Sequence, residues 1–123
     1  MSKIDFVILY VESPPASAAF YERLLGRKPV DASPGFAMFA LDNGTRLGLW
    51  AAHEIEPPAG ARGGGAEIAF VAKDRAEVDA RCAAWATQGL TIALKPTQLD
   101  FGYAFVALDP DGHRLRVFVP GAA

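Results

Sequence analysis

Residues 103–118 read YAFVALDPDGHRLRVF. They align with residues 36–50, FAMFALDNGTRLGLW, when one extra residue is allowed in the second turn. Both stretches contain Ala-Leu-Asp, then a turn, then Gly-x-Arg-Leu. Each predicts a β-hairpin, because Asn43-Gly44 and the Asp-Pro-Asp-Gly segment at 109–112 favour tight turns. A repeat of this length indicates that one structural unit is built twice.

The segments before the two hairpins also correspond. Residues 6–11 (FVILYV) and residues 67–71 (EIAFV) are apolar runs of strand length, rich in β-branched and aromatic residues. Short strands near residues 28–31 and 91–94 complete the pattern. Each unit is therefore predicted to contain four strands.

A helix is predicted between the first and second strand of each unit. The first begins after Ser13, a preferred N-cap residue, and ends at Gly26. The second begins at Asp74, which has Glu77 three residues on in a capping-box pattern, and it ends at Gly89.

The chain thus reads as two βαβββ modules, residues 3–52 and 65–120, within one domain spanning residues 1–123. Residues 53–64 (HEIEPPAGARGG) form a linker, because their prolines and glycines disfavour regular structure. The predicted fold class is α+β. A helix covers one face of each sheet, so the other faces are expected to border a cleft.

Composition excludes several classes of partner. The chain has 123 residues, 51% of them apolar, and its 12 Lys and Arg against 14 Asp and Glu give a net charge of −2. We therefore expect no electrostatic binding to nucleic acid or to an anionic membrane. The apolar stretch near the start is too short for a signal peptide or a membrane span, so we expect a cytoplasmic protein. Cys82 is the single cysteine, which excludes an internal disulfide and a cysteine-built zinc site.

Strand alternation predicts which side chains face the cleft, because neighbours in a strand point to opposite sides. In the last strand it places Arg114, Arg116 and Phe118 on the open face. Gly48 beside Trp50 suggests room for a flat ligand that stacks on the indole ring. The extra turn residue leaves the facing of strands 36–41 and 103–107 open. The predicted ligand-contacting residues are Phe6, Ile8, Met38, Phe39, Trp50, Glu67, Phe101, Tyr103 and Arg116.

Some of these residues have two interpretations. Glu67 and Arg116 could orient a ligand's carboxylate or ring nitrogen, or they could pair with each other, and the two roles are compatible. Trp50 could line the pocket or belong to the core. Trp85 and Cys82 lie on the apolar stripe of the second helix and are predicted to be core residues. Phe101, followed by Gly102, is expected at a mobile rim of the cleft.

The duplicated βαβββ plan, the segment SAAFYERLLGRKPV and the closing DPDGHRLRVF closely resemble the vicinal oxygen chelate superfamily. That superfamily includes glyoxalase I, extradiol dioxygenases and bleomycin resistance proteins. The resemblance spans nearly the whole chain. The two hairpin sequences look most like the phenazine antibiotic resistance branch.

The resemblance carries the metal-ligand positions of the superfamily's enzymes onto Phe6, Gly48, Glu67 and Arg116. Phe6 and Gly48 offer no donor atom and Arg116 is a permanent cation, so no metal, no other cofactor and no catalytic residue is expected. What the resemblance then implies is a homodimer with clefts shared between chains. It would sequester a planar aromatic antibiotic such as a phenazine. The alternatives are a metal-dependent lyase, dioxygenase or transferase with a rearranged site, or a module that binds a protein partner.

Overall fold

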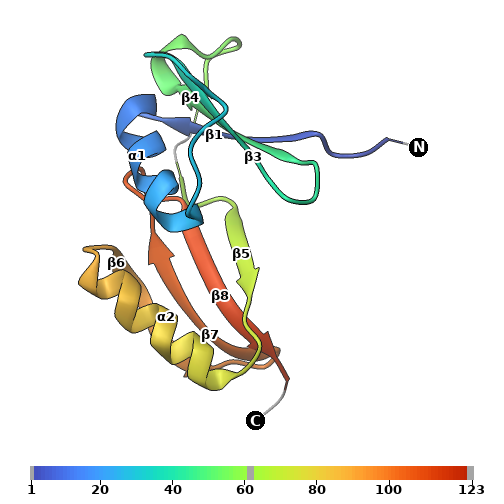
Figure 1. The fold of residues 1–123 in the computed structure, drawn as a ribbon, viewed down its shortest axis with the longest axis vertical. Helices are drawn as coiled ribbons and strands as arrows, with labels where there is room; N and C mark the ends of the chain where they lie inside the picture. Colours follow the sequence, from blue (N-terminus) through green and yellow to red (C-terminus); the bar gives the residue numbers. More distant parts are fainter. Residues whose placement is uncertain (1, 61–62, 122–123) are drawn as a thin grey trace. The chain divides into compact units, whose positions relative to one another are not determined.

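The computed structural model describes residues 2–60 and 63–121. The chain divides into two compact units, Met1–Gly63 and Gly64–Ala123. Each unit consists of one four-stranded mixed sheet and one α-helix, so the fold class is α+β as predicted (Figure 1).

The first unit has the sheet order β1-β4-β3-β2, in which β1 and β4 are parallel and the other pairs are antiparallel. Its elements are β1 (Phe6–Val11), α1 (Pro14–Leu25), β2 (Asp31–Ala32), β3 (Phe36–Ala40) and β4 (Arg46–Ala51). The second unit repeats this topology as β5-β8-β7-β6. Its elements are β5 (Glu67–Val71), α2 (Arg75–Thr87), β6 (Thr91–Gln98), β7 (Gly102–Leu108) and β8 (Arg114–Pro120).

The repeat extends to the strand register. Phe6 lies opposite Arg46 in the β1–β4 pair, and Glu67 lies opposite Arg114 in the β5–β8 pair. Two residues further along, Ile8 is paired with Gly48 and Ala69 with Arg116. Phe6 and Glu67 therefore occupy equivalent positions in the two sheets, and so do Gly48 and Arg116.

The predicted helix ends are confirmed by their capping contacts. The Ser13 hydroxyl accepts a hydrogen bond from the Ala16 amide at 3.2 Å, and Gly26 ends α1 in the left-handed conformation, with φ of 67°. The Asp74 carboxylate accepts from the Glu77 amide at 2.8 Å. These local bonds satisfy amides that the helices themselves leave unpaired.

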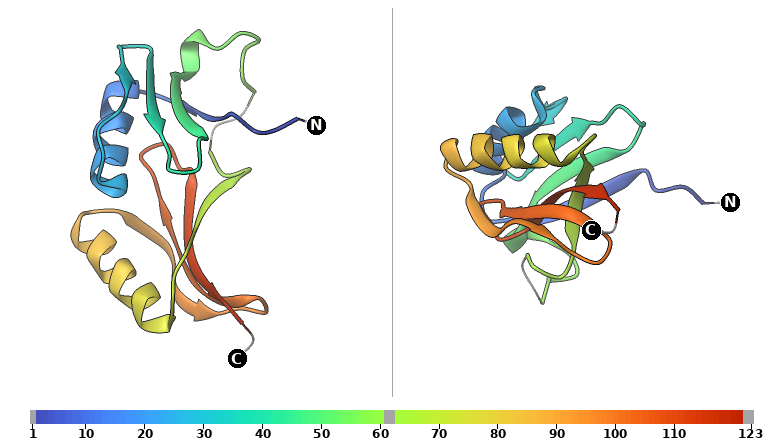
Figure 2. Two further views of the ribbon diagram at one scale, coloured as in Figure 1. Left: turned by 45° about the vertical axis from the view of Figure 1, so that its right-hand side comes forward. Right: turned by 90° about the horizontal axis from the view of Figure 1, so that it is seen from below.

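Each helix packs on one face of its own sheet and buries the apolar core of that unit (Figure 2). In the second unit, Trp85 of α2 lies edge-on to Phe70 and Phe105, with ring centroids 5.8 and 5.3 Å apart. Burial raises the pKa of the Cys82 thiol, and the charge of Asp79 raises it further. The prediction that Trp85 and Cys82 are core residues is confirmed.

Three segment boundaries differ from the sequence prediction. The region expected to be irregular begins with a 3-10 turn over Ala52–Glu54, and residues 61 and 62 of it lie outside the described residues. Strand β2 covers Asp31–Ala32 rather than 28–31. Strand β6 runs to Gln98 because register shifts accommodate Pro96 on an edge strand, where its missing N–H is tolerated.

Candidate functional site

The open face of each sheet is the face that does not carry the helix of its unit. In the first unit, the register places Ile8, Gly48 and Met38 side by side on this face, followed by Trp50 and Phe36. Phe6 lies on the same face of β1 and remains 44% exposed. The Trp50 ring lies edge-on to the Phe36 ring at 6.3 Å.

Phe39 does not belong to this face, and its prediction as a ligand contact is wrong. It pairs with Leu47, points toward α1 and is fully buried. A side chain enclosed by the helix and its own sheet cannot touch a ligand on the other side of that sheet. Met38, the other residue of β3 in the predicted set, faces the open side.

Gly48 also differs from expectation. A Cβ atom at this position would meet the Phe36 ring at 3.1 Å and the Ile8 side chain at 3.3 Å. The space beside Gly48 is therefore filled by Phe36 and Ile8 rather than left for a ligand. The missing side chain lets the Phe36 ring close over the strand, next to Trp50.

The open face of the second unit is organised around an ion pair. The Arg116 guanidinium donates through Nε to one Glu67 oxygen at 2.5 Å and through Nη2 to the other at 3.3 Å. The Arg116 side chain is 17% exposed and that of Glu67 34%. The predicted pairing is confirmed. The two bonds to the two carboxylate oxygens fix the orientation of the guanidinium, and arginine favours this bidentate geometry.

Two aromatic rings extend this cluster. Arg116 lies with its guanidinium carbon 5.6 Å from the centre of the Phe101 ring, and Phe101 is edge-on to Phe118 at 6.0 Å. Phe101 is half exposed. The open face therefore presents a free aromatic ring beside a fixed cation.

A small hollow of about 240 Å³ opens beside Arg116 on the same face. Its walls are Ala93, Leu94, Val106, Arg114 and Arg116. The Nη1 nitrogen of Arg116 is buried and has no hydrogen-bond partner among the described residues. Strand alternation predicts Arg114 and Phe118 on this face, although neither is among the predicted ligand-contacting residues.

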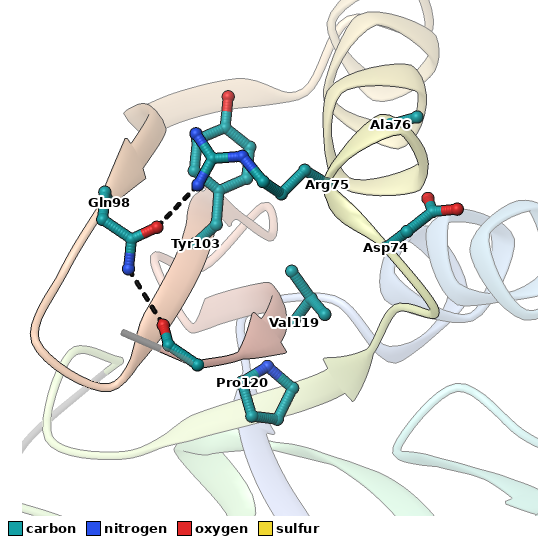
Figure 3. A pocket seen from close by; sticks show the side chains of 8 residues that line it. Asp74, Arg75, Ala76, Gln98, Tyr103, Val119 and Pro120 are labelled. Atoms are coloured by element: carbon teal, nitrogen blue, oxygen red, sulfur yellow. Dashed lines mark hydrogen bonds between the residues drawn. The ribbon is translucent and has the colours of Figure 1, made fainter. Parts of the chain in front are cut away.

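Tyr103, another residue of the predicted ligand-contacting set, lies on the helix side of the second sheet and not on its open face. Its hydroxyl donates to the Asp79 carboxylate at 2.7 Å, which raises the pKa of Tyr103. The Arg75 guanidinium covers the ring at 3.8 Å and donates to the Gln98 side chain at 2.6 Å (Figure 3). Tyr103, Arg75 and Gln98 border a separate pocket of about 500 Å³ at the start of α2.

The residues at the metal-ligand positions do not fit a divalent ion. Phe6 and Gly48 have no donor atom, and both oxygens of Glu67 are engaged by Arg116. A retained catalytic metal needs about three protein ligands and an open position. Within residues 2–60 and 63–121, no three His, Cys, Asp or Glu side chains come close enough together to hold a metal.

The comparisons with known proteins agree with this fold. The model of the Glyoxalase/Bleomycin resistance protein/Dioxygenase superfamily matches residues 3–117. A protein of Agrobacterium tumefaciens, solved in solution by NMR, is 48% identical over 99% of this chain and 100% of its own, with a TM-score of 0.90. None of the curated proteins matches the sequence.

Two more distant structures share the fold. A glyoxalase-related enzyme of Fulvimarina pelagi is 21% identical over 97% of this chain and 88% of its own, with a TM-score of 0.83. A glyoxalase/bleomycin resistance protein/dioxygenase of Nocardioides is 23% identical over 98% of this chain and 84% of its own, with a TM-score of 0.82. No helix among the described residues is long and apolar enough to cross a membrane.

Proposed function

Because this chain belongs to the glyoxalase/bleomycin resistance protein/dioxygenase superfamily, we propose its function from what its open sheet faces can bind. It is a metal-free binding protein of the cytoplasm that holds a planar aromatic antibiotic, such as a phenazine, without altering it. Resistance then arises from sequestration of the drug.

The observation that carries this proposal is the exposed aromatic surface of the second unit. Phe101 is half exposed beside Arg116, and Phe118 supports it from the side. An aromatic side chain left in water beside a fixed cation is suited to stacking on a flat ring. Trp50 and Phe6 offer aromatic surface on the open face of the first unit.

The donor set also favours capture over turnover. Superfamily enzymes that act through a metal need ligands that Phe6, Gly48 and Arg116 do not supply. The Glu67–Arg116 pair places a permanent cation where such chemistry would place the metal charge. A bound ligand would therefore be held by ring stacking and hydrogen bonds, with no Lewis acid to activate it.

The affinity that sequestration needs is within reach of such a surface. A micromolar dissociation constant corresponds to about −8 kcal/mol. Burial of roughly 300 Å² of apolar surface contributes about 7 kcal/mol, and each ring stacked on the ligand adds about 0.5–1.5 kcal/mol. The costs of association reduce this total, so micromolar rather than nanomolar binding is expected.

Titration with phenazine tests the proposal. We expect saturable quenching of the Trp50 emission, obtained as the difference between the spectra of the parent protein and of Trp50→Ala, which retains Trp85. Calorimetry on Trp50→Ala and on Phe101→Ala is expected to show affinity about tenfold weaker, because each loses one stacking face.

The matched control is Tyr103→Ala, which removes an aromatic ring on the helix side of the sheet and should leave the affinity unchanged. Unaltered binding in both Trp50→Ala and Phe101→Ala would disprove the stacking role. Elemental analysis giving one nickel, zinc, iron or manganese per chain would instead support the metal-dependent lyase, dioxygenase or transferase.

We also propose a homodimer whose clefts are shared between chains. Strand β1 is an edge strand, and Phe6, Val7 and Ile8 on it are 44, 42 and 39% exposed. Consecutive apolar residues exposed on both faces of an edge strand are typical of a surface that another chain covers.

Sedimentation equilibrium should give twice the chain mass, and Ile8→Lys should shift the protein to monomer. A monomeric parent protein would disprove the dimer.

A further inference from the structure

We propose that the hollow beside Arg116 is a carboxylate subsite, formed by Arg114 and Arg116 of β8, and that the ligand is therefore an aromatic carboxylate rather than a neutral ring. The position of the ring rests on the function proposed above. The carboxylate subsite rests on the charge, burial and size of the hollow, so it can be tested separately.

The charges around the hollow do not balance. Of the residues that the structure describes, two with guanidinium groups, Arg114 and Arg116, line it, and none with a carboxylate does. Glu67 stands beside it and is held by Arg116 through both oxygens. Arg114 has no ion-pair partner among the described residues. Arg114 is exposed, so its guanidinium is free to pair with an anionic group that enters the hollow.

Arg116 is held in place before any ligand arrives. Glu67 fixes Nε and Nη2, and the Phe101 ring lies 5.6 Å from the guanidinium carbon. The remaining nitrogen, Nη1, is buried without a partner among the described residues. Because Nη1 is enclosed by protein atoms, Arg116 acts on a ligand in the hollow through its fixed positive charge, which favours an anionic group.

The size of the hollow suits a small anionic group with the ring that carries it. Its volume of about 240 Å³ is below the usual range for pockets that enclose drug-sized molecules, roughly 300–1,000 Å³. The two arginines hold the carboxylate end, so the remaining part of a larger ligand extends from the hollow along the open face.

The aromatic rings lie where that outer part would be. Arg114, Arg116 and Phe118 alternate along β8 and share its open face. Neighbours on one face of a strand are about 7 Å apart, close to the span of a ring with its carboxylate. A carboxylate between the two arginines therefore leaves the ring over Phe101 and Phe118.

The test compares phenazine with phenazine-1-carboxylate by calorimetry. We expect the parent protein to bind the carboxylate about tenfold or more tightly, because a hydrogen-bonded ion pair is added. In Arg114→Gln that preference should fall to about threefold or less, with the affinity for phenazine unchanged. Arg114 is chosen because its replacement leaves the Glu67–Arg116 pair intact. Arg75→Gln, which removes an arginine on the helix side of the same sheet, should retain the full preference.

Equal affinity of the parent protein for the two compounds would overturn the carboxylate subsite and leave the proposed function standing. If neither compound binds, the proposed function fails, and the subsite is decided by benzoate alone. Benzoate should then shift the NMR signal of the Arg116 Nε–H in the parent protein and much less in Arg114→Gln. No shift, or a larger shift with inorganic phosphate at equal concentration, would overturn it.

Discussion

Glu67→Gln is expected to lower the free energy of unfolding by about 2–3 kcal/mol. The substitution keeps the shape of the side chain but removes the charge that faces the Arg116 guanidinium. Breaking a fully buried pair costs about 3–5 kcal/mol, and an exposed pair contributes at most about 1. The 17% exposure of Arg116 and the 34% exposure of Glu67 place this pair between the two limits. Urea denaturation at neutral pH measures the loss.

A double-mutant cycle separates the pair from its surroundings. Arg116→Met alone leaves the Glu67 carboxylate without its partner, and Glu67→Leu alone leaves the guanidinium without its partner, whereas the double variant Glu67→Leu/Arg116→Met replaces both charges by apolar groups. The double variant should be more stable than either single one, because it strands no charge. A loss below about 0.5 kcal/mol in Glu67→Gln would mean that the pair behaves as an ordinary surface contact.

The parts of the fold that depend on local chemistry could be predicted from the sequence. Helix α1 begins after Ser13 and ends at Gly26 because a capping hydroxyl and a left-handed glycine act within a few residues of each other. The repeat located both hairpins because turn residues fix their positions. Neither feature requires knowledge of distant contacts.

The facing of the hairpin strands could not be predicted from the repeat. Ala40 and Ala107 are equivalent in the aligned sequences, yet Ala40 faces the open side and Ala107 the helix. The extra residue in the second turn causes this reversal, since a shift of one residue moves every side chain of a strand to the other face. Because the sequence leaves the facing of this strand open, the predicted set contains both Met38 and Phe39, and only Met38 lies on the open face.

The space beside Gly48 depends on a contact between strands. The Phe36 ring fills it from β3, and the sequence alone does not show the rotamer that brings the ring there. The pairing of Glu67 and Arg116 was easier to predict, because strand alternation places both side chains on the open face of adjacent strands. Residue type and strand alternation predict which side chains lie on the open face. Whether neighbouring side chains fill the space above that face depends on their packing.

Gly102→Ala is expected to destabilise the protein by about 2–4 kcal/mol, through a backbone conflict rather than a lost contact. A Cβ atom at Gly102 would lie well inside van der Waals distance of the Val119 carbonyl oxygen, with the Cα of Pro120 at 3.0 Å. Both neighbours are main-chain atoms of β8, so neither can move aside as a flexible side chain would. Gly102 is thus required by close strand approach rather than by the mobile rim that the sequence suggested.

Gly102→Ala should also weaken ligand binding, because it displaces Phe101, the preceding residue. The Phe101 carbonyl accepts from the Gly121 amide at 2.9 Å, and the Leu99 amide donates to the Gly102 carbonyl at 2.8 Å. A shift of β7 away from β8 strains the Gly121–Phe101 bond and moves the Phe101 ring, together with the Leu99–Gly102 turn, away from Arg116. Gly65→Ala is the matched control, since a Cβ there meets nothing within 4 Å. Urea unfolding and phenazine titration of the two variants give the comparison. Equal stability of Gly102→Ala and Gly65→Ala would show that β7 and β8 can separate locally without cost.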